Sequence, residues 1–350
     1  MQKRKKQRSS NMELLRILSM LIIVMHHCVV HGKMTYTYDV FIPNRLFTDF
    51  FILGQLGVSL FMLITGYYQS KSEFKWQKLA TMWLEVVFYS LGIYLITAAM
   101  NGGETFSWDN LYKAVTPVIQ RRYWFVTAYF AVYILSPIWN AFAEKAERKQ
   151  FFVILFSCAV LFSVLPTLTN RDIFLESGKS VMWMSVLYLT GAYLRKYPDA
   201  KIIKRSVCLP VGIVTAVLII ASEVLIDHFA MQDETLKKFV TYATNETSRF
   251  PLYILALSIF SFFVTVDIPY QRVINEIGAS TFGVYLIHDN LYMRKILWID
   301  LFGFNNHRFH PLLIPYMMCC AVLVFVCCIG IDRMRMKLFS FFRTQRAGLR

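Results

Sequence analysis

The sequence predicts an all-α protein, a polytopic membrane bundle of about ten transmembrane helices. Hydrophobic residues make up 56% of the 350 positions and aromatic residues 16%, well above the apolar content of an average soluble domain. The apolar residues also form runs, many of which reach the roughly 17–25 residues that a helix needs to cross a bilayer. We therefore expect one integral-membrane domain over residues 1–350.

The apolar runs place the expected spans in ten segments. These cover residues 12–31, 46–69, 76–100, 123–143, 150–166, 180–195, 206–226, 249–266, 279–298 and 311–331. The ninth run is the most polar, because His288, Asp289 and Asn290 interrupt it. Three consecutive polar residues cannot all face lipid, so we expect this helix to border a cavity lined by protein.

Basic residues indicate the orientation. The chain carries 37 Lys and Arg against 22 Asp and Glu, a net charge of +15. Most of these cations lie in segments that are cytoplasmic if both termini are inside, as the positive-inside rule requires. We expect a multi-pass protein of the cell membrane with cytoplasmic basic tails at 1–10 and 332–350. A nucleic-acid binder would instead cluster cations on a soluble module, so the expected partner is membrane lipid and not nucleic acid.

Ionisable residues inside the first span are candidates for function, because they are costly to insert into a membrane. Glu13 and Arg16 are three residues apart and share a helix face, so they can pair. His27 lies eleven residues after Arg16, about three turns, which places it on the same face ~16 Å further along the axis. All three are candidate catalytic residues. The structural alternatives are that Arg16 snorkels to headgroups and that His27 bonds to a neighbouring helix.

Three lysines follow the second span at the expected cytoplasmic side: Lys71, Lys75 and Lys78. Their spacing suits one side of a cytoplasmic mouth, where they would attract a phosphate-bearing ligand from the cytosol. The alternative is that they act only as positive-inside topology signals.

On the outer side, Arg121 and Arg122 break the positive-inside pattern, and they suit an anionic or hydroxyl-rich acceptor. Tyr123 and Trp124 come next and fit either an interfacial aromatic belt or the same acceptor site. His288 lies in the outer half of its helix, as His27 does. It either faces the acceptor or is held by a polar neighbour at the helix end.

The cysteines give no sign of a metal site. All seven lie within or beside apolar runs and show no CxxC spacing. In such positions cysteine behaves as a small hydrophobic residue. We therefore expect neither a metal nor a disulfide framework.

Four segments resemble the membrane acyltransferase-3 superfamily, and within it the Gram-positive branch that modifies surface polysaccharides. They read NMELLRILSMLIIVMHH, LGVSLFMLITGYY, YWFVTAYFAVYILSP and ASTFGVYLIHD. The resemblance covers essentially the whole chain. It includes the family pattern of an arginine, ten residues and a histidine, which Arg16 and His27 fit. It implies that His27, and not His26, has the catalytic role.

The resemblance implies an O-acyltransferase without a metal cofactor. The acyl group is usually acetyl from cytoplasmic acetyl-CoA, and the acceptor is a carbohydrate hydroxyl outside the membrane. Residues 65–67 match an SGF-like turn that many relatives follow with paired arginines thought to help hold CoA, and this chain has Lys71 and Lys75 there. Acetyl-CoA or another acyl-CoA is thus the expected co-substrate, and an extracytoplasmic glycan the expected acceptor.

Within this hypothesis, His27 acts as a general base for the acceptor hydroxyl or takes the acyl group itself. Arg16 steers the pantetheine end or the thioester of the donor. The main rival is a transporter or flippase for a small polar solute or a lipid-linked sugar, although the sequence lacks the matched broken helices typical of transporters. A receptor or scaffold would not need the stripe formed by Arg16 and His27. The sequence does not indicate the oligomeric state.

Overall fold

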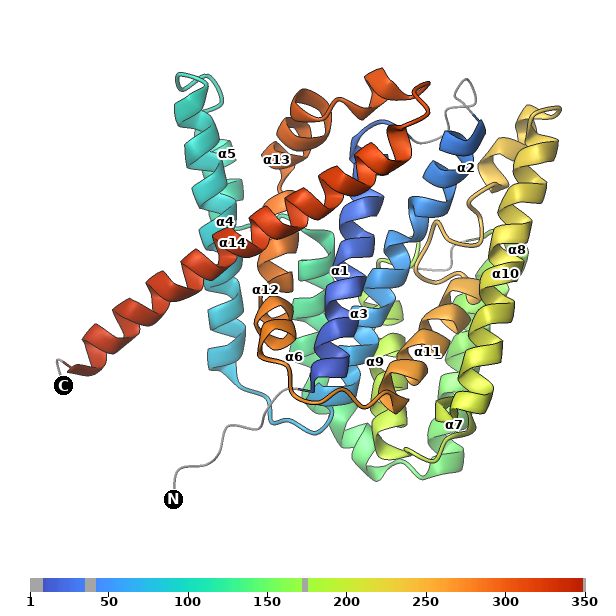
Figure 1. Cartoon of the computed structure of the whole chain (residues 1–350). Coiled ribbons are helices and arrows are strands. Elements are labelled where there is room, and N and C mark those ends of the chain that lie inside the picture. Colours follow the sequence, from blue (N-terminus) through green and yellow to red (C-terminus); the bar gives the residue numbers. More distant parts are fainter. Residues whose placement is uncertain (1–8, 35–41, 172–175, 349–350) are drawn as a thin grey trace.

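The computed structural model describes residues 9–34, 42–171 and 176–348. All regular structure in these ranges is helical, as predicted. The helices pack side by side in a bundle, and the first of them, α1, begins at its lower end and rises to its upper end (Figure 1). Most of the basic tail expected at 1–10 lies outside the described residues.

Within the described part of the chain, seven stretches are long and apolar enough to cross a membrane. They are α1 (Ser10–His31), α2 with α3 (Ile42–Gln69), α4 (Trp76–Met100), α6 (Trp124–Lys145), α7 with α8 (Arg148–Thr169), α10 (Arg205–Ala230) and the Leu313–Ser340 part of α14 (Leu313–Gly348). Three shorter helices occupy the other expected spans: α9 (Val181–Lys196), α11 (Phe250–Thr265) and α12 (Arg272–His288). A further short helix, α5 (Trp108–Val115), lies in the loop expected after α4.

The centre of the bundle is α3, which packs against α1, α9 and α11. Its contact with α9 is close because glycines lie between the two backbones. Gly66 of α3 lies against the backbone of Tyr188, and Gly191 of α9 lies against the carbonyl of Leu63. A Cβ at either glycine would overlap those backbone atoms, so small residues permit this approach as they do in other membrane helix pairs.

The second expected span, 46–69, is not one uninterrupted helix. It consists of α2 (Ile42–Phe50), a 3-10 turn (Phe51–Leu53) and α3 (Gly54–Gln69). The division coincides with the His26 ring, which lies so close to Gly54 that no Cβ would fit there. The fifth expected span is divided as well, by a π-helical turn between α7 (Arg148–Ala159) and α8 (Leu165–Thr169).

The bounds expected for the ninth span, 279–298, are wrong. α12 begins at Arg272 and ends at His288, and a separate short helix, α13 (Leu291–Lys295), follows. The chain turns at Asn290, whose side-chain oxygen accepts a hydrogen bond from the backbone N–H of Tyr292 at 3.0 Å. An asparagine in this position caps a new helix, so the polar residues end one helix and begin another.

The last expected span, 311–331, ends too early, because α14 continues as a helix to Gly348 and includes the described part of the expected basic tail at 332–350. Asp332 is fully buried and accepts hydrogen bonds from Tyr89 of α4 at 2.8 Å and from Arg335 at 2.9 Å. Arg335 also pairs with Glu85 at 2.8 Å. These polar contacts tie α14 to α4 beyond the point where its apolar run ends.

We predict that Gly191→Ala weakens the contact between α3 and α9. The added methyl group overlaps the carbonyl of Leu63, and overpacking of this kind costs about 1–3 kcal/mol. Unfolding of the purified protein in detergent would measure the loss of stability. The matched control is Gly92→Ala in α4, where a Cβ meets nothing within 4 Å and the loss of glycine flexibility stabilises a helix by about 0.5–1 kcal/mol. Wild-type stability of the Gly191 variant would contradict the close contact.

Candidate active site

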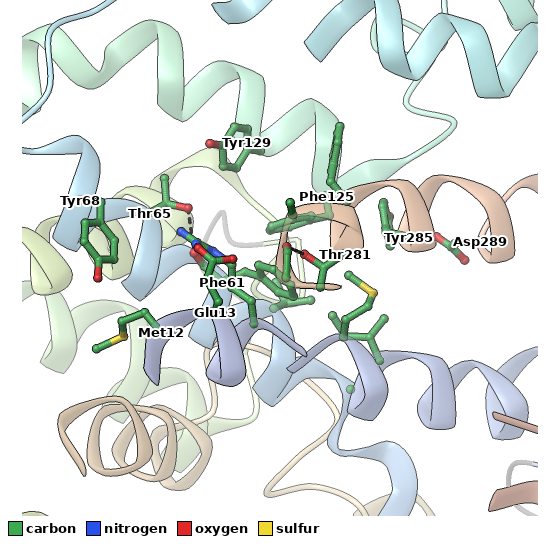
Figure 2. Close-up of a pocket in the computed structure, with 18 of the residues that line it drawn as sticks. Met12, Glu13, Phe61, Thr65, Tyr68, Phe125, Tyr129, Thr281, Tyr285 and Asp289 are labelled. Atoms are coloured by element: carbon green, nitrogen blue, oxygen red, sulfur yellow. Dashed lines mark hydrogen bonds and ion pairs between the residues drawn. The ribbon is translucent and has the colours of Figure 1, made fainter. Parts of the chain in front are cut away.

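One cavity of about 900 Å³ lies inside the bundle and extends from its lower to its upper end. Its lower part is lined by Ser9, Lys71 and Lys78, and its upper part by His31 and Arg294. Figure 2 shows the order of the side chains along it: Tyr68, Thr65, Met12 and Glu13 at one end, Phe61, Phe125 and Thr281 in the middle, and Tyr285 and Asp289 at the other end.

The lower part of the cavity contains the ion pair that the sequence spacing predicts. Arg16 donates from Nη1 to the Glu13 carboxylate, and its guanidinium lies 5.9 Å from the centre of the Tyr68 ring. Glu13 is buried against Gly278 of α12, where a Cβ would overlap its carboxylate. The packing of α1 on α12 therefore holds this pair in the cavity wall.

His27 faces the upper part of the cavity and contacts His288. Its Nδ1 lies 2.9 Å from Nε2 of His288, whose own Nδ1 lies 2.6 Å from the carbonyl oxygen of Val284. A carbonyl oxygen only accepts, so Nδ1 of His288 carries a hydrogen and Nε2 of the neutral ring is an acceptor. His27 must then donate from Nδ1, and in its neutral form Nε2 carries a lone pair.

Nε2 of His27 is available to a substrate in the cavity. Within the described ranges it has no hydrogen-bond partner, and the His27 ring lines the cavity. A neutral imidazole that is held at Nδ1 and open at Nε2 is the arrangement that a general base requires. His26 lines the cavity too, but its ring packs on Gly54.

Asp289 is buried and joins the two histidines of α1 to α13. Its Oδ1 lies 3.5 Å from Nδ1 of His27, 3.1 Å from Nε2 of His31 and 2.9 Å from Nε of Arg294. A carboxylate beside Nδ1 stabilises the imidazolium that forms when the other ring nitrogen takes a proton, as in hydrolase triads. The upper part of the cavity thus contains an acid–base group.

Comparison with known proteins identifies the family. The profile of the acyltransferase-3 family, described as an acyltransferase domain, matches residues 9–333, nearly the whole chain. The chain belongs to this family. The resemblance to the acyltransferase-3 superfamily is therefore confirmed, and the acid–base group lies in an acyltransferase. Searches among curated proteins and among solved structures found no match.

In this acyltransferase Tyr123 is a buried support and not part of an aromatic belt. It is only 1% exposed. Its hydroxyl donates to the carbonyl of Leu286 at 3.0 Å and accepts from Nδ2 of Asn290 at 2.8 Å. Both partners flank His288 and Asp289, so Tyr123 holds the turn that carries them.

The other aromatic and basic candidates of the upper side divide into two groups. Trp124 lines the cavity. Arg121 is exposed and pairs with Glu176, and Arg122 lies 5.9 Å from the centre of the Tyr292 ring. Neither arginine lines the cavity, so the structure does not bring them together with His27.

Of the three lysines expected at the cytoplasmic mouth, two line the cavity and one does not. Lys71 and Lys78 line the lower mouth, where Nζ of Lys78 donates to Gln69 at 2.9 Å. Lys75 does not line the cavity, and its backbone N–H donates to the hydroxyl of Tyr133 at 3.2 Å. Two of the three candidates for donor binding are therefore placed at the cavity.

Sequence reasoning missed three basic residues of the cavity wall: Lys179, Arg195 and Arg294. Arg195 donates to the hydroxyl of Tyr67 at 3.1 Å, although in the sequence it is one of several cations at the end of a span. Arg294 follows Asp289 by little more than one turn, and this closeness to a polar segment was the available signal.

His27, His31 and Asp289 also offer ligand atoms that lie within 4.8 Å of one another, a spacing that suits a metal ion. Two polar atoms of these residues already have protein partners. Nδ1 of His27 contacts His288, and Oδ1 of Asp289 accepts from Arg294. Arg294 thereby supplies a positive charge beside the carboxylate.

We predict that Tyr123→Phe destabilises the protein by about 1–3 kcal/mol, because Asn290 and Leu286 each lose a buried hydrogen-bond partner. Acyl transfer should also fall, since the turn that carries Asp289 loses its support. Thermal unfolding in detergent and a transfer assay measure the two effects. The control is Tyr292→Phe, because the hydroxyl of Tyr292 makes no hydrogen bond in the described part of the chain. Equal behaviour of the two variants would contradict the supporting role of Tyr123.

Proposed function

We propose that this acyltransferase moves an acetyl group from cytoplasmic acetyl-CoA to a hydroxyl of a carbohydrate outside the membrane. The observation that carries the proposal is the continuous cavity between a basic lower mouth and the acid–base group of His27, His288 and Asp289. Donor and acceptor can then enter from opposite ends. The upper end is taken as the outer side because the cations near the lower end follow the positive-inside rule.

The lower part of the cavity has the charge expected of a CoA site. Arg16, Lys71, Lys78 and Arg195 line it, and among the described lining residues of that part Glu13 is the acidic one. Several cations at one mouth attract a ligand with several phosphates. The side chain of Arg16 is 23% exposed and lies near the start of α1, ~16 Å below His27 along the axis. It therefore suits the pantetheine arm better than the thioester.

The acid–base group supports the proposal, because it can move the proton that transfer to a hydroxyl requires. The acceptor hydroxyl gives its proton to Nε2 of His27 while its oxygen attacks the thioester carbonyl. Asp289 stabilises the resulting imidazolium. Collapse of the tetrahedral adduct breaks the carbon–sulfur bond, and the proton on His27 passes to the leaving sulfur. The products are an acetyl ester and CoA thiol, and His27 returns to its neutral form.

We predict that His27→Ala lowers surface O-acetylation by about 10²–10⁴-fold, the contribution typical of a general base. Arg16→Ala should raise the KM for acetyl-CoA, since it removes a cation from the donor side. Mass spectrometry of surface glycans from cells that express each variant at equal levels measures the acetyl content. The control is His228→Ala, because His228 is exposed on α10 and does not line the cavity.

Two results would contradict this proposal. One is normal surface acetylation with His27→Ala at wild-type expression. The other is uptake of a labelled solute into proteoliposomes without any dependence on acetyl-CoA, which would favour a transporter. Isolation of an acetyl group bound to His27 would instead assign it the role of acyl carrier.

We further propose that transfer proceeds without a metal, because Arg294 supplies the positive charge at Asp289 that a cation would supply. We predict that EDTA leaves the transfer rate of the purified enzyme unchanged. Loss of activity in EDTA with recovery upon addition of Zn²⁺ would contradict this prediction and assign the ion to His27, His31 and Asp289.

A further inference from the structure

The upper part of the cavity contains a lysine that the transfer chemistry does not use. Lys179 lines the cavity just before α9. Its Nζ lies 5.5 Å from the centre of the Trp124 ring, and no carboxylate of the described residues pairs with it. The nearby acids have other partners, since Glu176 pairs with Arg121 and Asp289 with Arg294.

The segment that carries Lys179 is held in place by its neighbours. Gly178 adopts a φ of 75°, and a Cβ there would lie 2.6 Å from the backbone nitrogen of Ser248. The buried hydroxyl of Thr247 donates to the carbonyl of Gly178. On the other side, the hydroxyl of Ser180 caps α9 by accepting from Trp183 N–H at 3.3 Å. The backbone of Lys179 is therefore fixed at the cavity wall.

Part of the Arg294 guanidinium remains available to bind a ligand. Its Nε donates to Oδ1 of Asp289 at 2.9 Å and to the carbonyl of the same residue at 3.0 Å. Neither of its two Nη groups has an acceptor among the described residues, and the side chain is 27% exposed at the cavity wall. A guanidinium in this state can still donate two parallel hydrogen bonds to a carboxylate or a phosphate.

The charges of this region do not balance. Lys179 and Arg294 are positive, and Asp289 is the acidic residue among the described lining residues of the upper part. Lys179 contacts the Trp124 ring but no carboxylate of the described residues, and a cation without an anionic partner is costly wherever a bound substrate excludes water. A neutral sugar would leave that charge uncompensated, whereas a substrate with one negative group would offset it. Lys179 lies over the ring of Trp124, and the part of that ring that lines the cavity can contact the apolar side of a sugar ring.

We infer that the acceptor is an anionic glycan. Its carboxylate or phosphate binds Lys179 and the Nη groups of Arg294, its sugar ring lies against Trp124, and its hydroxyl reaches His27. The inference rests on the proposed function and specifies the acceptor of that same site. A uronic acid and a sugar phosphate present the same chemistry to these donors.

The test compares three acceptors of equal length with the purified enzyme and acetyl-CoA: a neutral oligosaccharide, the same oligosaccharide with a uronic acid, and one with a phosphate. We expect a higher kcat/KM for one or both anionic acceptors, and a KM for them that rises with salt as the charges are screened. The preferred anion distinguishes the carboxylate from the phosphate.

Variants at Lys179 assign the effect to this residue. Lys179→Gln should raise the KM for the anionic acceptor about tenfold, the worth of one hydrogen bond to a charged group. The loss with the neutral acceptor should be much smaller, because that acceptor has no anionic group for Lys179 to bind. Lys179→Arg keeps the charge and should restore most of the affinity. The control is Lys238→Gln, because Lys238 is exposed and does not line the cavity.

Equal kcat/KM for neutral and anionic acceptors, or an equal loss on both in Lys179→Gln, would overturn the inference and leave the proposed function intact. Transfer to none of the carbohydrates, with acetyl-CoA still bound, would overturn the proposed function itself.

Discussion

The buried carboxylate of Asp289 is the constraint on which the upper half of the bundle depends. A charge inside an apolar helix bundle is tolerated only with partners that offset its loss of water. Here the partners come from two other elements, since His31 belongs to α1 and Arg294 to α13. To bring Arg294 back to Asp289, the chain must leave α12 at His288, and the cap of Asn290 makes that exit. Both the end of α12 and its packing on α1 thus place partners around the carboxylate of Asp289.

The same rule applies elsewhere in the bundle. Arg45 of α2 meets Asp227 of α10 in a buried pair with two hydrogen bonds of 2.8 Å each. Asp332 ties α14 to α4 through Tyr89. In each case a polar contact joins helices that are far apart in the sequence. Since apolar surfaces gain little from contact with each other inside lipid, such contacts and close glycine packing give the bundle its specific arrangement.

A single helix connects the two ends of the proposed reaction. Arg16 and His27 both belong to α1, so their separation cannot change without breaking that helix. The donor must therefore be long enough to reach the histidine while its charged end stays near the lower mouth. The local structure of α1 sets a length requirement for the donor, and the neighbouring helices provide the walls of the cavity.

The helical fold, the pairing of Glu13 with Arg16 and the position of His27 on their face could be predicted from the sequence. These depend on the regular spacing within one helix, which the order of residues specifies directly. The sequence did not determine the end of α12, the burial of Tyr123 or the continuation of α14, nor did it separate Lys78 from Lys75 at the mouth. These features depend on the packing of the helices, which also places Lys179 and Arg294 at the cavity. Contacts between helices depend on which faces meet, and the spacing of residues along one helix does not contain that information.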